Sequence, residues 1–219
     1  MDSKKLQLKC NWRLFYTKTK AQRQNLNQFI SHLEKIADIE TVEDLYKHYI
    51  HLKRPSELVS KDNYMFFRDG LIPAWENFPN GGCWIIKVSK NNGLIDRIWE
   101  EIIFAAACEK FLDLDMIGIM VSIRGREDKI SIWNRGSKVL NNGERLRKIL
   151  NLDPETHLQY QSFSHAVEVG ATYRDAISFV YKPFFYKSSG VDNKIEHKLG
   201  KKDDLVGASS KGDAGEATV

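Results

Sequence analysis

The stretch YMFFRDGLIPAWEN (residues 64–77), followed by GGCWIIKV (residues 81–88), decides the fold and contains the most unusual residue of the chain. Residues 64–68 and 83–88 are rich in aromatic and β-branched side chains and are bounded by turn-forming residues, a pattern that predicts two strands. Trp75 lies between them, after a segment with Gly and Pro, and is therefore expected on a loop. A loop tryptophan exposes a large apolar ring face, which calls for a functional explanation.

Glu76 directly follows this tryptophan. A tryptophan face beside a carboxylate suits a cationic planar base, because the face stacks on the base and attracts its charge. The carboxylate can accept two parallel N–H hydrogen bonds of the kind that guanine donates. The alternative is that Trp75 packs onto the core and Glu76 is an ordinary solvated charge, and the residues alone leave both interpretations open.

Upstream of this stretch, the pattern predicts a strand at 12–17 and a weak helix or irregular segment at 22–36. The sequence TVED (residues 41–44) matches a capping box with Asp in the position of Glu, so a helix is expected to begin there. Its apolar residues recur with the spacing i, i+3, i+4, i+7, at Val42, Leu45, Tyr46 and Tyr49.

Downstream, the same criteria predict a helix at 95–111, strands at 116–124 and 129–134, a helix at about 142–151, and strands near 157–162 and 174–185. The first of these helices is apolar along one face, at Ile95, Ile98, Trp99, Ile102, Ile103 and Ala106. A polar turn joins the first two strands, so they should form a hairpin. Strands joined by turns, with helices between groups of strands, predict an α+β protein whose helices cover one face of an antiparallel sheet.

Length and composition indicate one globular domain. The chain has 219 residues, of which 42% are hydrophobic and 28% are charged, and its net charge of +4 permits a nucleic-acid partner without requiring one. From residue 188 onward there is no aromatic residue, and Gly, Ser, Lys and Asp are frequent. We therefore expect a short N-terminal arm at 1–7, a folded domain at 8–187 and a disordered polar and basic tail at 188–219.

Several classes of protein are excluded by what the sequence lacks. Cys10, Cys83 and Cys108 are widely spaced and odd in number, which favours buried, reduced thiols. There is neither a secretory leader pattern nor a long apolar run, so a cytoplasmic protein without a membrane partner is expected. No phosphate-binding loop, metalloprotease motif or nucleophile–base pair occurs, so we expect no enzyme, no metal and no cofactor. His48 and His51 are interpreted as surface or boundary residues and not as metal ligands.

Four blocks of sequence occur in an order that points to a known family. They are the stretch at 64–84, TVED at 41–44, DRIWE at 96–100 and SIRGREDKISIW at 122–133. As a set they resemble translation initiation factor 4E, and the resemblance extends over about residues 8 to 185. It implies a curved antiparallel sheet of about eight strands with three long helices on its convex face. The chain is expected to be a monomer.

The resemblance also implies a function, which is binding of the 7-methylguanosine cap of messenger RNA for its recruitment to translation initiation. In this family two aromatic residues sandwich the methylated guanine, and Trp75 matches one of them. Glu76 matches the carboxylate that pairs with the guanine edge, and Trp133 the tryptophan that touches the N7-methyl group. Arg124 and Lys129 match the basic residues that hold the triphosphate. Because methylation makes the guanine cationic, these assignments agree with the residue chemistry.

Some positions depart from the family pattern. The second sandwich residue is usually Trp, and the matching position here is Phe29, whose cation–π attraction is weaker. Cys83 stands where a basic residue is common, which removes one potential phosphate contact. A late basic residue that approaches the phosphates has no clear match in 164–172, although Arg174 is nearby. The alternative is therefore a divergent member with weak cap binding that acts as a translational repressor or interaction scaffold.

The convex face of this family binds scaffold or repressor proteins through a short helix with a Tyr-x4-Leu-hydrophobic motif. The resemblance assigns this role to Val42, Tyr46, Trp99 and Glu101. Tyr46 occupies the place of a Trp, and Glu100 the place of a Leu. Tyr46 can contact a partner or simply pack its own helix, and both interpretations stay open.

Overall fold

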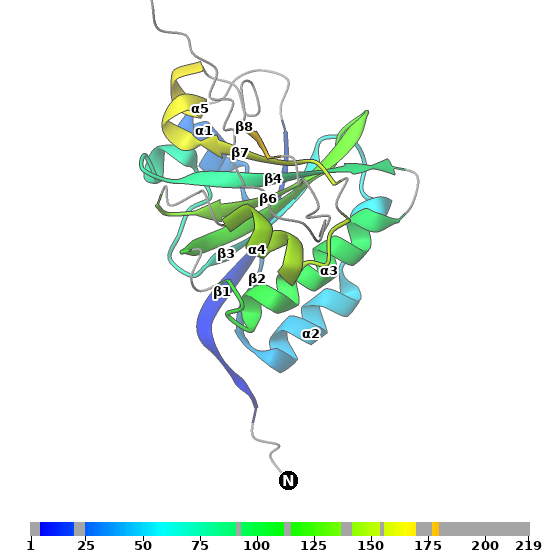
Figure 1. Ribbon diagram of the computed structural model, residues 1–219. Helices are drawn as coiled ribbons and strands as arrows, with labels where there is room; N and C mark the ends of the chain where they lie inside the picture. The colour runs from blue at the N-terminus through cyan, green and yellow to red at the C-terminus, as the bar shows by residue number, and fades with distance from the viewer. Residues whose placement is uncertain are drawn as a thin grey trace, which may run out of the picture. The chain divides into compact units, whose positions relative to one another are not determined.

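The structure is a computed structural model of the chain, and it describes residues 5–19, 25–90, 93–111, 115–136, 142–153, 156–169 and 177–179 (Figure 1). The tail predicted at 188–219 lies outside these residues, as do the first residues of the arm and most of the strand predicted at 174–185. Arg174 is also outside them.

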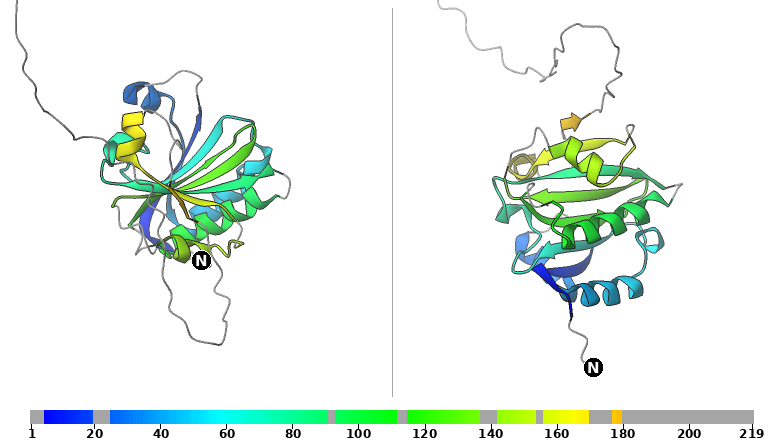
Figure 2. Two further views of the ribbon diagram at one scale, coloured as in Figure 1. Left: turned by 45° about the horizontal axis from the view of Figure 1, so that its top comes forward. Right: turned by 60° about the horizontal axis from the view of Figure 1, so that its bottom comes forward.

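The described strands form one antiparallel sheet of eight strands in the order β2-β1-β3-β5-β6-β4-β7-β8 (Figures 1 and 2). In chain order the strands are β1 Gln7–Lys18, β2 Glu34–Thr41, β3 Asp62–Arg68, β4 Gly82–Ser89, β5 Met116–Ser122, β6 Glu127–Asn134, β7 Leu158–Ser162 and β8 Ile177–Phe179. The predicted hairpin of β5 and β6 is confirmed, and β6 separates β5 from β4.

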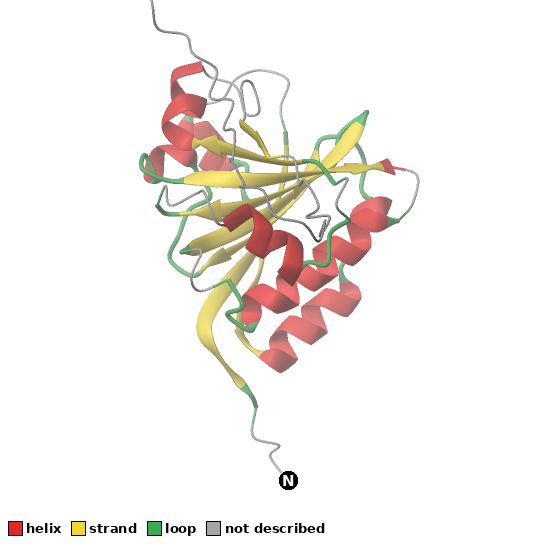
Figure 3. Cartoon of the chain, in the orientation of Figure 1, coloured by secondary structure: helices red, strands yellow, loops and turns green. Residues whose placement is uncertain are grey.

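Three helices, α2, α3 and α4, cover one face of this sheet, which we call the helical face (Figures 2 and 3). The helices among the described residues are α1 Leu26–Ser31, α2 Val42–His51, α3 Leu94–Ala107, α4 Asn142–Ile149 and α5 Phe163–Val169, with 3-10 turns at η1 Pro55–Glu57 and η2 Trp75–Asn77. The expected fold class, a curved antiparallel sheet with three helices packed on it, is confirmed. No helix of the described ranges is long and apolar enough to cross a membrane.

The main core lies between the helical face and the three helices. Every second residue of the central strands points into it, as Trp84 and Ile86 do on β4, and the whole predicted apolar face of α3 is buried there. Trp12 and Phe66 stack in this layer, with ring centroids 4.6 Å apart and planes 5° apart. Burial of so many large apolar side chains is the main term that stabilises the domain.

The start of α2 is set by the predicted capping box. The Asp44 backbone N–H donates to Thr41 Oγ1 at 3.0 Å, and the Thr41 N–H donates to Asp44 Oδ2 at 3.1 Å. Two amide groups that the helix cannot satisfy internally are thereby paired. The chain therefore passes from the end of β2 directly into α2.

Three sequence-based expectations were wrong in detail. The segment predicted at 22–36 as a weak helix or irregular contains helix α1, but residues 34–36 belong to strand β2. Only Ala37, Ile39 and Thr41 of this edge strand face the core, so its apolar pattern is short. Helix α5 was not predicted. Helix α3 ends at Ala107 and not at 111, because the chain turns there and leaves Cys108 exposed, so the thiols are not all buried.

Candidate functional site

The sheet face opposite α2, α3 and α4, which we call the open face, carries a second apolar cluster. Strand alternation produces it: Ile130 and Ile132 of β6 point to the helical face, so Lys129, Ser131 and Trp133 point to the open face. The buried members of the cluster are Phe15, Met65, Phe67, Phe78, Cys83, Ile85, Ile117, Met120, Trp133 and Phe163. Phe29, Leu33, Leu71 and Trp75 pack against it and are only partly buried.

The structure thus brings Phe29, Trp75 and Trp133 to one cluster from three separate parts of the chain. Phe29 lies on α1, a short helix fixed by Asn25, whose side chain accepts from the Gln28 N–H at 2.9 Å. Trp75 opens η2, where its carbonyl accepts from the Phe78 N–H at 2.9 Å. Both rings are half-buried, so each packs on the cluster and still keeps part of its surface accessible to a ligand.

Neither alternative considered for Trp75 describes it fully, because its ring packs on the open-face cluster but is only partly buried. Glu76, the second residue of η2, is exposed. Within the described residues, no hydrogen bond or ion pair involves its carboxylate. This carboxylate is held beside an apolar surface by a structured turn and is available to a ligand.

Trp133 is the deepest of the three aromatic residues, with 1% of its surface exposed. Its ring lies against Phe67, at 5.2 Å between centroids and 80° between planes, and against Phe163, at 4.5 Å and 50°. Its indole N–H is buried and has no hydrogen-bond partner among the described groups. Phe163 begins α5, which lies next to η2, so α5 and Trp133 close one end of the cluster.

Arg124 and Lys129 lie together at the tip of the β5–β6 hairpin. The Arg124 guanidinium is oriented by its neighbours, since Nη2 donates to Asn63 Oδ1 at 2.9 Å and to Thr19 Oγ1 at 3.2 Å. Burial lowers the pKa of Lys129, and the positive charges of Lys87 and Arg124 lower it further. The two residues that the sequence pairs for phosphate binding are thus close enough to repel each other.

Cys83 lies on the open face opposite Trp133, where β4 pairs with β6. It is 3% exposed, and burial raises the pKa of its thiol to about 12. The thiol is therefore neutral at physiological pH and cannot replace the basic residue common at this position.

Two residues of the open face, Phe163 and Lys87, were not identified from the sequence. The alternation of Cys83, Ile85 and Lys87 along β4 was the available signal for Lys87.

The predicted partner residues lie on the helical side, and their exposure differs. Val42 and Tyr46 of α2 are 41% and 59% exposed, whereas Trp99 of α3 is 1% exposed and packs near the Tyr64 ring. Glu101 is half-buried and forms an ion pair with Arg97 at 2.8 Å. Val42 and Tyr46 are therefore accessible on the surface of α2, whereas the Trp99 side chain is covered by its neighbours.

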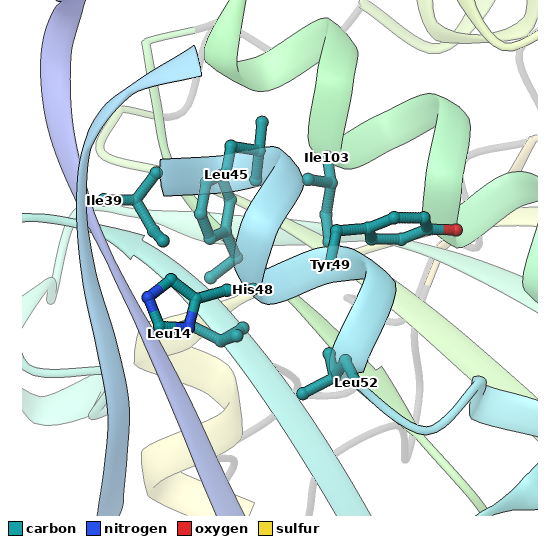
Figure 4. A pocket seen from close by; sticks show the side chains of 8 residues that line it. Leu14, Ile39, Leu45, His48, Tyr49, Leu52 and Ile103 are labelled. Carbon is teal, nitrogen blue, oxygen red and sulfur yellow. The ribbon is translucent and has the colours of Figure 1, made fainter. Parts of the chain in front are cut away.

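Beneath α2, a small apolar pocket separates this helix from α3 and the sheet (Figure 4). His48 and Tyr49 line it together with leucine and isoleucine side chains, so the His48 ring lies against apolar neighbours. The described residues contain no group of three or more His, Cys, Asp or Glu side chains placed to hold a metal ion.

Comparison with known proteins identifies a family that the chain matches and proteins of similar sequence. Residues 7–176 match the model of the family described as eukaryotic initiation factor 4E. The chain is similar to eukaryotic translation initiation factor 4E-4 of Caenorhabditis elegans, with 35% identity over 161 residues, which are 70% of this chain and 75% of the relative.

Two solved structures of eIF4E-3 from Ascaris suum have a similar fold. The complex with the m7G cap superimposes with a TM-score of 0.68 and 27% identity, covering 82% of this chain and 100% of the other. The complex with the m2,2,7G cap gives a TM-score of 0.65 and 29% identity, covering 73% and 92%.

Proposed function

The chain belongs to the eukaryotic initiation factor 4E family, and we propose that it binds the 7-methylguanosine cap of messenger RNA and recruits the RNA to translation initiation. The observation that carries the proposal is the meeting of Phe29, Trp75 and Trp133 in one apolar cluster, with the Glu76 carboxylate at its margin. An apolar site with a few polar groups at its edge is the usual form of a ligand site. The relative that was solved with an m7G cap supports the assignment.

The base is held by the two half-buried rings and the exposed carboxylate. Phe29 and Trp75 offer faces on which the cationic 7-methylguanine stacks, and the positive charge of the base strengthens the attraction over that of plain guanine. Glu76 accepts the N1 and N2 protons of guanine in two charge-assisted hydrogen bonds. Trp133, which is buried behind Phe67 and Phe163, forms the floor of the cluster and limits how deeply the base enters.

The phosphates are held at the hairpin tip by Arg124 and Lys129. Arg124 is already oriented by Asn63 and Thr19, so little side-chain freedom is lost when an anion binds. The mutual repulsion of the two cations falls when a phosphate lies between them. The site therefore favours a nucleotide that carries several phosphates over the bare nucleoside.

As a member of an initiation-factor family, the chain is a binding protein and not an enzyme, which confirms the expectation from the sequence. We place it in the cytoplasm, where messenger RNA is translated.

A second function, translational repression or scaffolding with weak cap binding, is favoured by two observations. Phe29 presents a smaller ring than the usual Trp. Cys83 is buried and neutral, so the site has one positive charge fewer than is common at this position. Both changes lower cap affinity without altering the fold.

For the protein partner, we propose that Val42 and Tyr46 receive the apolar anchors of a short helix with a Tyr-x4-Leu-hydrophobic motif. The Glu100 carboxylate, which accepts from the Tyr49 hydroxyl at 2.8 Å, lies where an apolar contact is usual. A generic motif peptide should therefore bind weakly. The native partner should carry a basic residue facing Glu100 or Glu101.

The test of the main proposal is a titration of tryptophan fluorescence with 7-methyl-GTP and with GTP. We expect quenching by 7-methyl-GTP and at least about tenfold weaker binding of GTP, because a desolvated cation–π contact contributes about 1–2 kcal/mol. Trp75→Ala should abolish most of the binding. Tyr46→Ala is the matched control, because it removes an exposed aromatic side chain from the helical side. Equal affinities for the two nucleotides would exclude the stacked-cation model.

A further inference from the structure

Lys87 of β4 and Lys129 of β6 lie directly opposite each other in the antiparallel sheet. Both are half-buried, and both point to the open face, because Ile86, Val88 and Ile130 point into the main core. Opposite residues of this kind have Cβ atoms about 5 Å apart, and like charges in such a pair are destabilising. Two half-buried lysines that face each other on one side of a sheet form a local concentration of positive charge, which favours the binding of an anion.

A third positive charge lies close to the pair. On the other side of Lys129, β5 places Ser122 opposite it, and the Arg124 guanidinium follows at the hairpin tip. The charges of Lys87 and Arg124 lower the pKa of Lys129, and the charge of Glu127 acts in the opposite direction. The Asp128 carboxylate is already engaged, since it accepts from Lys90 Nζ at 3.0 Å and from the Arg124 N–H at 2.9 Å.

The distance between the lysine pair and the aromatic cluster suits a nucleotide whose base stacks on the cluster and whose phosphates reach the lysines. Trp133 lies opposite Cys83 in the same two strands, and both lysines come four residues away from these two positions. Four residues of a strand span about 13 Å. This length matches the distance from a nucleobase to the terminal phosphates of the same nucleotide. The β4 strand lacks a cation at Cys83 but carries one at Lys87 on the same face.

We propose that Lys87 is a further phosphate-binding residue, which holds the polyphosphate of the stacked nucleotide between its ammonium group and that of Lys129. This inference rests on the proposed cap binding and assigns a residue to it that the family pattern did not indicate. The bound phosphate replaces the repulsion of the two lysines with two attractions. The polyphosphate therefore lies over the centre of the open face and not only at the hairpin tip.

The experiment compares two ligands, 7-methylguanosine and 7-methyl-GTP, on the full chain and on Lys87→Met, which keeps the apolar stem of the side chain. We expect about a tenfold loss of 7-methyl-GTP affinity, as for one charged hydrogen bond, and an unchanged affinity for 7-methylguanosine. The dependence of 7-methyl-GTP affinity on salt should also become less steep. Lys87→Arg should keep most of the affinity. The control is Lys47→Met, which removes the same charge from an exposed position on α2.

The outcomes separate the two proposals. If the unmodified chain binds neither ligand, the proposed cap binding fails. If it binds both and Lys87→Met retains the full affinity for 7-methyl-GTP, the inference about Lys87 is overturned. Equal losses for both ligands would also overturn it, since Lys87 would then act on the base site. A loss confined to capped oligonucleotides would overturn it too and would assign Lys87 to the RNA chain.

Thermal unfolding of the free protein gives a separate readout. Removal of one member of a repelling pair should leave the melting temperature unchanged or slightly higher. A fall of several degrees in Lys87→Met would show that the side chain stabilises the free protein, which would contradict the repulsion between Lys87 and Lys129 on which the inference is based.

Discussion

Replacement of Glu76 by alanine isolates the recognition of the guanine edge. The carboxylate is exposed, lies at the margin of the open-face cluster, and makes no hydrogen bond or ion pair within the described part of the chain. Its contribution should therefore appear in binding and not in folding. Two charge-assisted hydrogen bonds, reduced by partial exposure to water, contribute about 2–4 kcal/mol, which is about 30-fold to 900-fold in affinity.

The assay has two parts. Titration of tryptophan fluorescence with 7-methyl-GTP measures the loss of affinity in Glu76→Ala, and thermal unfolding of the free protein measures stability. The melting temperature should change by no more than about 1–2 °C, because a surface side chain without partners contributes at most about 0.5 kcal/mol. Glu144→Ala, an exposed acidic residue in the first turn of α4 on the helical side, is the matched control for both measurements.

Two results would refute the reasoning. Binding of 7-methyl-GTP by Glu76→Ala with unchanged affinity would show that another group reads the guanine edge. A marked fall in melting temperature would show that the carboxylate stabilises η2, so that any loss of affinity reflects a displaced Trp75.

The remaining predictions address other parts of the molecule. Phe29→Trp should bind 7-methyl-GTP several-fold more tightly in calorimetry, because indole is the better cation–π partner; weaker binding would place the second stacking residue elsewhere. Arg124→Gln should lose more affinity for 7-methyl-GTP than for 7-methylguanosine, and binding that is insensitive to salt would remove it from the site. Tyr46→Trp combined with Glu100→Leu should bind a Tyr-x4-Leu peptide at least about tenfold more tightly in calorimetry, from added apolar burial. Deletion of 190–219 should leave cap affinity and melting temperature unchanged, and a clear drop in either would show that the tail packs on the domain.

Local sequence determined the elements with strong short-range signals. The TVED capping box places the start of α2, and the apolar periodicity of 95–106 gives the face that α3 buries. Aromatic and β-branched residues bounded by turn-forming residues predicted β3 and β4 correctly, and the polar turn between 116–124 and 129–134 predicted the β5–β6 hairpin. The pairing of Trp75 with Glu76 could also be recognised, because adjacent residues need no fold to bring them together.

Features that depend on contacts between residues far apart in the sequence could not be predicted from local sequence. Strand β2 lies at an edge and buries only Ala37, Ile39 and Thr41, so its local signal is weak. Helix α5 acquires its role from contact with Trp133 through Phe163, a neighbour thirty residues away in sequence. The depth of Trp133 itself depends on Phe67 of β3 and Phe163 of α5, whose rings lie against it.

The set of residues that meet in the candidate site also depends on contacts between distant parts of the sequence. The sequence determined which residue types were available, namely an aromatic residue beside a carboxylate and basic residues near a hairpin. Only the tertiary structure decided that Phe29 reaches the cluster of Trp75, and that Lys87 faces Lys129. The physical reason is that strand order and register are selected by burial over the whole sheet, and a change of one residue in register would move either lysine to the opposite face.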